Sequence, residues 1–146
     1  MGAATRLNEV STVEEHVRAF SNQDWAAWAK SVHPDATYQE YATNRMIKGP
    51  EAIIEGLKKW TAAFPDLKGT VTNTVAEGNR VAIEVTWTGT HRGTLEGPMG
   101  AISPTGRQGD VHGVEVFTFE GERIKEMRHY FDTMELLRAL GVMPAG

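Results

Sequence analysis

The sequence predicts an α+β protein in which helices come first and strands follow. Apolar residues recur at helical spacing as far as Phe64, and from Leu67 onward the pattern changes to that of strands. Helices followed by an antiparallel meander are typical of the α+β class. We expect three amphipathic helices to lie across one face of a curved antiparallel sheet and to enclose a pocket between the two layers.

Composition narrows the function classes. The 146 residues predict a single domain, and the absence of cysteine excludes disulfides and thiolate sites. A net charge of −4, with no cluster of Lys and Arg, argues against a nucleic-acid partner. No apolar run has the length of a membrane span, and the N-terminus lacks a signal-peptide core. We therefore expect a soluble cytoplasmic protein with no membrane partner.

The first helix is predicted from Thr12 to Ser21, with Ser11–Glu14 as a capping box, and residues 1–10 are expected to be disordered. A second, shorter helix carries Trp25 and Trp28 on one face. The segment His33-Pro34-Asp35 is predicted to be a turn, because a proline disfavours helix in the residue before it.

A short strand is predicted over residues 36–41, and a third helix opens at Gly49-Pro50 and ends at Phe64. Two strands, 67–77 and 80–91, are joined by the hairpin signal Gly78-Asn79. Residues 92–106 hold four glycines and two prolines, so this segment is expected to be a long loop. The last helix is predicted from Thr133 to Leu140.

The hairpin of residues 107–132 carries most of the candidate chemistry, and its register decides which side chains share a face. A three-residue loop, Glu120–Glu122, places Glu115 opposite Met127 and Gly113 opposite His129. The alternative two-residue loop pairs Glu115 with Arg128. We favour the three-residue loop, which gives one face with few charges, made of Glu115, Phe117, Met127, His129 and Phe131. The other face then holds Val114, Val116, Glu126, Arg128 and Tyr130.

Four motifs in this order resemble the SnoaL-like polyketide cyclases of the nuclear-transport-factor-two-like superfamily. They are Phe64-Pro65-Asp66-Leu67, the loop Ile102–Arg107, the turn Phe119–Ile124, and the ending Tyr130-Phe131-Asp132 with Leu136–Gly141. The resemblance covers roughly residues 10–142. It implies a cone-shaped α+β fold with a deep apolar pocket, commonly dimeric. It also implies aldol-type ring closure of a polyketide without metal or cofactor.

Ring closure of this kind requires a base that removes a proton from carbon and donors that stabilise the oxygen anions. A carboxylate in a dry aromatic pocket suits the task, because desolvation raises its pKa toward neutrality. The candidates for catalysis are Glu115, His129 and Asp132. Each has a structural alternative: a rim ion pair between Glu115 and Arg128, a half-buried structural histidine, and an N-cap for the last helix.

Further residues are candidates for the wall of a substrate pocket. Tyr38 and Trp87 are favoured because they lie on predicted strands, whereas the helical spacing of Trp60 is more typical of core. His112 is included although the alternation predicts that it faces the opposite side. The full set of substrate-binding candidates is Tyr38, Trp60, Trp87, Phe117, Met127, Phe131 and His112.

Metal and nucleotide sites have no support in the spacing. His112 and Glu115 are three residues apart on a strand, and no His-x-His or glycine-rich phosphate motif is present. We expect no metal and no cofactor.

Three functions compete. The first is a cofactor-independent SnoaL-like cyclase or isomerase acting on a small apolar molecule that carries a carbonyl group. The second is an epoxide hydrolase of the same superfamily, although a close Arg-x-Asp or Asp-x-Arg pair is missing. The third is a non-catalytic ligand-binding or dimerisation module. A homodimer is expected through the outer face of the sheet, where Val114, Val116 and Tyr130 form an apolar strip.

Overall fold

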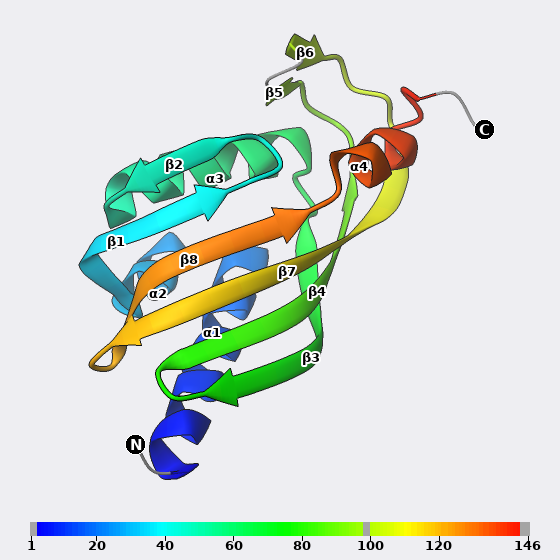
Figure 1. Ribbon diagram of the computed structural model, residues 1–146. Coiled ribbons are helices and arrows are strands. Elements are labelled where there is room, and N and C mark those ends of the chain that lie inside the picture. The colour runs from blue at the N-terminus through cyan, green and yellow to red at the C-terminus, as the bar shows by residue number, and fades with distance from the viewer. Residues whose placement is uncertain (1–2, 98–99, 144–146) are drawn as a thin grey trace.

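The computed structural model describes residues 3–97 and 100–143 and has the predicted α+β architecture. A six-stranded sheet has the order β2-β1-β8-β7-β4-β3, and a two-stranded sheet, β5-β6, projects beyond its end. Helices α1, α2 and α3 lie on one side of the large sheet, and α4 lies where β8 ends (Figure 1).

The helices are α1 (Ala3–Ser21), α2 (Trp25–Lys30), α3 (Pro50–Ala63) and α4 (Thr133–Ala139). The strands of the large sheet are β1 (Val32–Glu40), β2 (Arg45–Lys48), β3 (Lys68–Glu77), β4 (Arg80–Thr90), β7 (Gln108–Glu120) and β8 (Arg123–Phe131). The segment expected to be a loop contains β5 (Leu95–Gly97) and β6 (Gly100–Ile102), with residues 98 and 99 outside the described part.

The first helix differs most from the sequence prediction. It begins at Ala3, so the described residues 3–10 are helical, and Ser11 lies inside the helix instead of capping it. The apolar stripe extends back to Val10, which packs against the core ahead of the buried Val13 and Val17. Full burial of a side chain such as Val13 or Val17 stabilises the fold by about 1.5–3 kcal/mol, and the partly buried Val10 adds to this, which outweighs the local capping signal. Residues 1 and 2 of the segment expected to be disordered lie outside the described residues.

The other helices follow their local signals. Asp24 is the N-cap of α2, and its side chain accepts a hydrogen bond from the amide of Ala27 at 3.1 Å. Pro50 opens α3 directly after Gly49, whose φ of 90° is in the left-handed region. The expected turn at residues 33–35 is instead an irregular part of β1, since the register with β8 shifts between Val32 and Thr37.

The sheet is mixed, because β1 runs parallel to β8 while all other pairs in the large sheet are antiparallel. This pairing brings the first strand of the chain against the last one. Two cores result: a large one between the sheet and α1–α3, and a smaller one around α4 that contains Phe64, Leu95, Leu136 and Leu140.

The hairpin of β7 and β8 contains the bulge that decides its register. Glu120 pairs with Arg123 around a two-residue turn, so the favoured three-residue loop is wrong. Lys125 is then an extra residue on β8, and beyond it Glu115 pairs with His129. The bulge moves the register by one residue, and the predicted division into two faces is therefore correct even though the predicted pairs are not.

Candidate active site

A cavity lies between the concave face of the sheet and the helices. Its volume is about 90 Å³, which is room for several water molecules. Most of its wall is apolar, and the sheet contributes one carboxyl group, that of Glu115. The wall residues from the helices and their connections are His16, Val17, Phe20, Trp28, Leu57, Trp60, Phe64, Leu67, Leu136, Ala139 and Leu140. Those from the sheet and the segment before β7 are Tyr38, Trp87, Gly89, Arg107, Gly109, Val111, Glu115, Met127, His129 and Phe131.

Three ionisable side chains lie in one row across adjacent strands. Glu40 on β1 pairs with His129 on β8, which pairs with Glu115 on β7. On the next strand Ile83 pairs with Glu115, and its apolar side chain ends the row. Since residues in one cross-strand row face the same side of a sheet, all three ionisable groups point toward the helix layer.

Glu115 has the properties of a proton-transfer group. Its side chain is 7% exposed, and no described residue gives it a hydrogen bond. Burial, and secondarily the negative charge of Glu40, raises the pKa of Glu115 to about 8. The carboxyl group is therefore mainly protonated at neutral pH, while a fraction is ionised.

His129 is held as a neutral imidazole by its neighbours. The indole of Trp87 donates its N–H to Nε2 at 3.2 Å, and because an indole can only donate, Nε2 is unprotonated. The ring proton is then on Nδ1, which lies 3.2 Å from the hydroxyl of Tyr38. Burial lowers the pKa of His129 to about 4, against a smaller upward effect of Glu40. In this arrangement neither ring nitrogen is free to accept a further proton.

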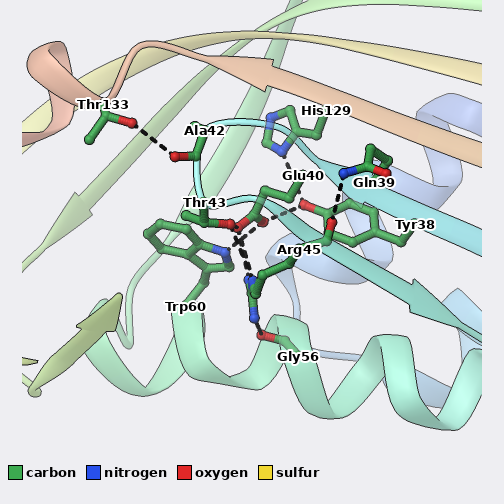
Figure 2. A network of polar contacts seen from close by, with 10 residues as sticks. All are labelled: Tyr38, Gln39, Glu40, Ala42, Thr43, Arg45, Gly56, Trp60, His129 and Thr133. Atoms are coloured by element: carbon green, nitrogen blue, oxygen red, sulfur yellow. Dashed lines mark hydrogen bonds and ion pairs between the residues drawn. The ribbon is translucent and has the colours of Figure 1, made fainter. Parts of the chain in front are cut away.

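Glu40 ends this chain of hydrogen bonds as a buried carboxylate (Figure 2). Its Oε2 accepts hydrogen bonds from the Tyr38 hydroxyl at 2.6 Å and the Trp60 indole at 3.0 Å. Its Oε1 accepts from Thr43 and from the Arg45 guanidinium, the latter at 2.9 Å. Burial by itself raises the pKa of Glu40, but these hydrogen bonds and the charge of Arg45 together lower the pKa below its ordinary value.

His16, which the sequence did not suggest, lies on the helix side of the cavity. Its Nδ1 is 3.1 Å from the hydroxyl oxygen of Ser31, and its ring packs against Trp28 and Phe117. Burial lowers the pKa of His16 to about 3, so this ring is neutral too. The cavity thus contains two uncharged imidazoles and one mainly uncharged carboxylic acid.

Most of the predicted wall residues line the cavity, and three predicted residues do not. Tyr38, Trp60, Trp87, Met127 and Phe131 are in the wall, together with Glu115 and His129. Phe117 is fully buried beneath it, because it packs against His16 in the core.

His112 and Asp132 lie on the outside of the molecule. The side chain of His112 is 71% exposed and forms an ion pair with Glu135 at 2.9 Å, as expected for a residue on the outer face of β7. Contrary to the expectation for a substrate-binding residue, His112 therefore lies away from the cavity. Asp132 is exposed and is the N-cap of α4, where its carboxylate accepts a hydrogen bond from the amide of Met134 at 2.8 Å. This is the structural alternative that the sequence had left open.

Besides His16, sequence reasoning missed Glu40. A usable signal was present, since Ala36, Tyr38 and Glu40 alternate on one face of the predicted strand, and an acid on the same face as an aromatic residue is unusual in a core. Its neighbour His129 comes from the far end of the chain, however, and only the parallel pairing of β1 with β8 brings them together.

The described residues form neither a metal-binding cluster nor a helix able to cross a membrane. Within residues 3–97 and 100–143, no group of three or more His, Asp or Glu side chains is arranged to hold a metal ion. In the same part of the chain, no helix is both long and apolar enough to cross a bilayer.

A curved sheet, a covering helix layer and a buried acid in an apolar cavity define a class of small α+β proteins with an internal cavity. The chain belongs to the SnoaL-like polyketide cyclase family, whose sequence model matches residues 11–140. No curated protein matches the chain.

Solved structures with the same fold cover nearly the whole chain. AclR, a proposed hydroxylase from Streptomyces galilaeus, is 26% identical with a TM-score of 0.82, over 96% of this chain and 89% of AclR. IdmH, a proposed polyketide cyclase from Streptomyces antibioticus, is 25% identical with a TM-score of 0.78, over 92% and 99% of the two chains. A SnoaL-like protein from Jannaschia sp. CCS1 is 24% identical with a TM-score of 0.86 and covers 99% of each chain. These neighbours are assigned different reactions, so the reaction must be argued from the site.

Proposed function

We propose that this protein is a cofactor-independent cyclase or isomerase that uses Glu115 as its acid–base group. The observation that carries the proposal is the placement of Glu115: it is buried, it receives no hydrogen bond from any described residue, and it faces an apolar cavity. A buried carboxyl group without a partner is costly for stability, and such groups concentrate at sites of proton transfer.

In the proposed reaction, ionised Glu115 removes a proton from a carbon next to a carbonyl group of the substrate. The resulting enolate carbon attacks a second carbonyl carbon of the same molecule, and a carbon–carbon bond forms as that carbonyl π bond becomes an alkoxide. Glu115 then returns the proton to the alkoxide oxygen. The product is an isomer of the substrate, so no electron acceptor or other co-reactant is required. A pKa of about 8 lies close enough to neutral pH for one group to serve as base and then as acid.

The cavity favours an apolar substrate that carries carbonyl groups. Aromatic and aliphatic side chains form most of its wall, and such a wall excludes water that would quench an enolate. The proposed polyketide-like substrate also agrees with membership of the SnoaL-like family.

The competing epoxide-hydrolase function has weaker support. Such a reaction requires charged groups that activate a water molecule at the cavity. Arg45, which is partly exposed, forms an ion pair with the buried Glu40 instead, and neither residue lines the cavity. A protein that only binds a ligand would use the same cavity without converting the ligand. Measurement of ring closure therefore separates ligand binding from the proposed reaction.

The test measures ring closure of apolar polyketo methyl esters. Liquid chromatography separates the product from the substrate, and mass spectrometry confirms that the two have the same mass. We expect Glu115→Gln to lower turnover by roughly a hundredfold or more, since an amide cannot take up the proton. Asp132→Asn is the matched control: it also replaces a carboxylate by an amide, but outside the cavity, and turnover is expected to be retained. Equal turnover in wild type and a folded Glu115→Gln variant would remove Glu115 from the mechanism.

A further inference from the structure

Glu40 lies behind the cavity wall in a position from which it can control the proposed acid–base group. It is fully buried, absent from the wall itself, and one strand beyond His129 in the row that ends at Glu115 and Ile83. Adjacent strands are about 4.8 Å apart, so the backbones of Glu40 and Glu115 are separated by roughly 10 Å with one imidazole between them.

The hydrogen bonds around Glu40 have one consistent direction. Four side chains donate to its carboxylate: Tyr38, Thr43, Arg45 and Trp60. With all of its nearest contacts acting as donors, this carboxylate is stabilised as an anion. The Tyr38 hydroxyl donates its proton in a hydrogen bond to Glu40, and the Tyr38 oxygen therefore accepts a hydrogen bond from the Nδ1–H of His129.

Trp87 fixes the other side of the His129 ring, because its indole N–H donates a hydrogen bond to Nε2. Protonation of His129 would place two N–H groups face to face at this contact. The imidazole therefore stays neutral, and it supplies no positive charge that would offset Glu40 as seen from Glu115.

We propose that Glu40 is a positioning residue of this site: its hydrogen bond with Tyr38 fixes the orientation of His129, and its buried negative charge acts on Glu115 along the same cross-strand row. Glu40 is absent from the cavity wall and acts through its hydrogen bonds with the wall residues Tyr38 and Trp60, through His129, and through its electric field. The inference rests on the proposed function of Glu115, and it adds that a second, hidden carboxylate raises the proton affinity of Glu115 beyond the effect of burial.

Other groups near Glu115 do not produce the same effect. Tyr38 is held neutral by burial and by Glu40, which raise its pKa well above the ordinary value. His16 on α1 and His129 on β8 are neutral, β4 presents the apolar Ile83, and Arg45 on β2 is engaged by Glu40. Arg107 also lines the cavity, but it is exposed, so solvent screens its charge. Within the water-excluded part of the site, the charge nearest to Glu115 is thus the negative charge of Glu40, and Arg45 lies one strand further along the row.

The experiment is a titration that requires no substrate. In protein labelled with carbon-13 at the glutamate carboxyl carbons, the Glu115 resonance is identified by its loss in Glu115→Gln and the Glu40 resonance by its loss in Glu40→Gln. We expect Glu115 to titrate near pH 8 and Glu40 to remain ionised throughout pH 5–9. A Glu40 that is protonated at neutral pH in the wild type would overturn the proposal. The titration itself is measured on the wild-type protein, and the Glu40→Gln variant is needed only to assign the resonance.

Two variants separate charge from hydrogen bonding. In folded Glu40→Gln, the pKa of Glu115 is expected to fall by about one unit or more, since the like charge is gone. In Tyr38→Phe the charge of Glu40 remains, so the titration of Glu115 is expected to stay close to that of the wild type, while the nitrogen-15 signal of Nδ1 in His129 changes because its acceptor is lost. An equal fall of the Glu115 pKa in both variants would contradict the role of charge.

Glu84→Gln is the matched control for charge removal, because Glu84 is exposed on β4, where its carboxylate accepts a hydrogen bond from the Asn73 amide at 2.8 Å. It should leave the titration of Glu115 unchanged. If a substrate is turned over, the pH–rate profile of Glu40→Gln should move to lower pH with the Glu115 titration, whereas a merely structural loss would lower the rate at every pH. A protein that titrates as expected but catalyses no ring closure would refute the proposed function and leave this inference standing.

Discussion

Glu115 and His129 are directly opposed across the antiparallel pair of β7 and β8, and both side chains line the same cavity. Side chains opposed in this way have Cβ atoms about 4.5–5.5 Å apart. Both ring nitrogens of His129 are engaged by Tyr38 and Trp87, whereas Glu115 has no hydrogen-bond donor among the described residues. The carboxyl group is therefore the member of the pair whose proton is free to move.

The first prediction concerns stability at alkaline pH. Glu115 binds its proton more tightly in the folded protein, where its pKa is about 8, than in the unfolded chain, where it is about 4.5. Unfolding between these values releases a proton, so this stabilisation is fully present below pH 4.5 and is lost as the pH rises through 8. Glu115→Gln should abolish this loss. The free energy of unfolding of the variant, relative to that of wild type, should therefore be about 3–5 kcal/mol higher at pH 9 than at pH 5. Urea denaturation at several pH values measures the difference.

Asp132→Asn serves as the reference for that series, because it changes an exposed carboxylate and should reproduce the wild-type pH dependence. A wild-type protein whose stability does not fall between pH 5 and 9 relative to Glu115→Gln would show that Glu115 is ionised when folded.

The second prediction concerns acid pH. His16 and His129 are neutral in the fold, with pKa values of about 3 and about 4 against an ordinary value of 6.5. Their contribution to stability is present above pH 6.5 and is lost as the pH falls, because the unfolded chain takes up protons that the folded protein cannot. His16→Gln should reduce the loss of stability between pH 6.5 and 4.5. Thermal denaturation at these two pH values tests this, and an undiminished acid loss in the variant would mean that His16 is solvated or paired in solution.

The third prediction concerns the glycine beneath the imidazole. A Cβ atom at Gly113 would lie 2.9 Å from Nε2 of His129 and 3.5 Å from Nε1 of Trp87. Gly113→Ala should therefore displace this pair and destabilise the protein by about 1–3 kcal/mol. Chemical denaturation gives the energy, and the indole N–H resonance of Trp87 should shift. Gly97→Ala is the control, since an added Cβ there meets nothing within 4 Å.

The fourth prediction separates capping from catalysis at Asp132. As the N-cap of α4, it should tolerate asparagine with little loss, whereas alanine should cost about 0.5–2 kcal/mol. Turnover should be retained in Asp132→Asn. A folded, stable Asp132→Asn variant that has lost turnover would move the proton-transfer role away from Glu115.

The fifth prediction is a homodimer through the outer face of the sheet. Val114 and Tyr130 pair on that face and are 38% and 42% exposed, and Tyr41 stacks on Tyr130 with ring centroids 4.7 Å apart. An apolar strip of this kind on a sheet favours association with a second copy. Light scattering at micromolar concentration should give the mass of a dimer, and Val114→Glu should reduce it to that of a monomer. A wild-type protein that is monomeric under these conditions would exclude this interface.

Local sequence determined those parts of the protein in which neighbours along the chain decide the outcome. Gly49-Pro50 starts α3, Asp24 caps α2, and the alternation along β7 places Glu115 and Phe117 on one face. These features depend on backbone preference and on periods of 3.6 or 2 residues, which are visible without a fold.

Tertiary structure decided the rest, because it depends on contacts between distant segments. Tyr38 and His129 are 91 residues apart, and the parallel pairing of β1 with β8 that joins them leaves no periodic trace in either strand. The bulge at Lys125 set the cross-strand pairs, and the burial of Val10 extended α1 past its capping signal. The protonation of Glu115 is likewise a property of the assembled site, since desolvation and the charge of Glu40 exist only after the sheet and the helix layer have closed around it.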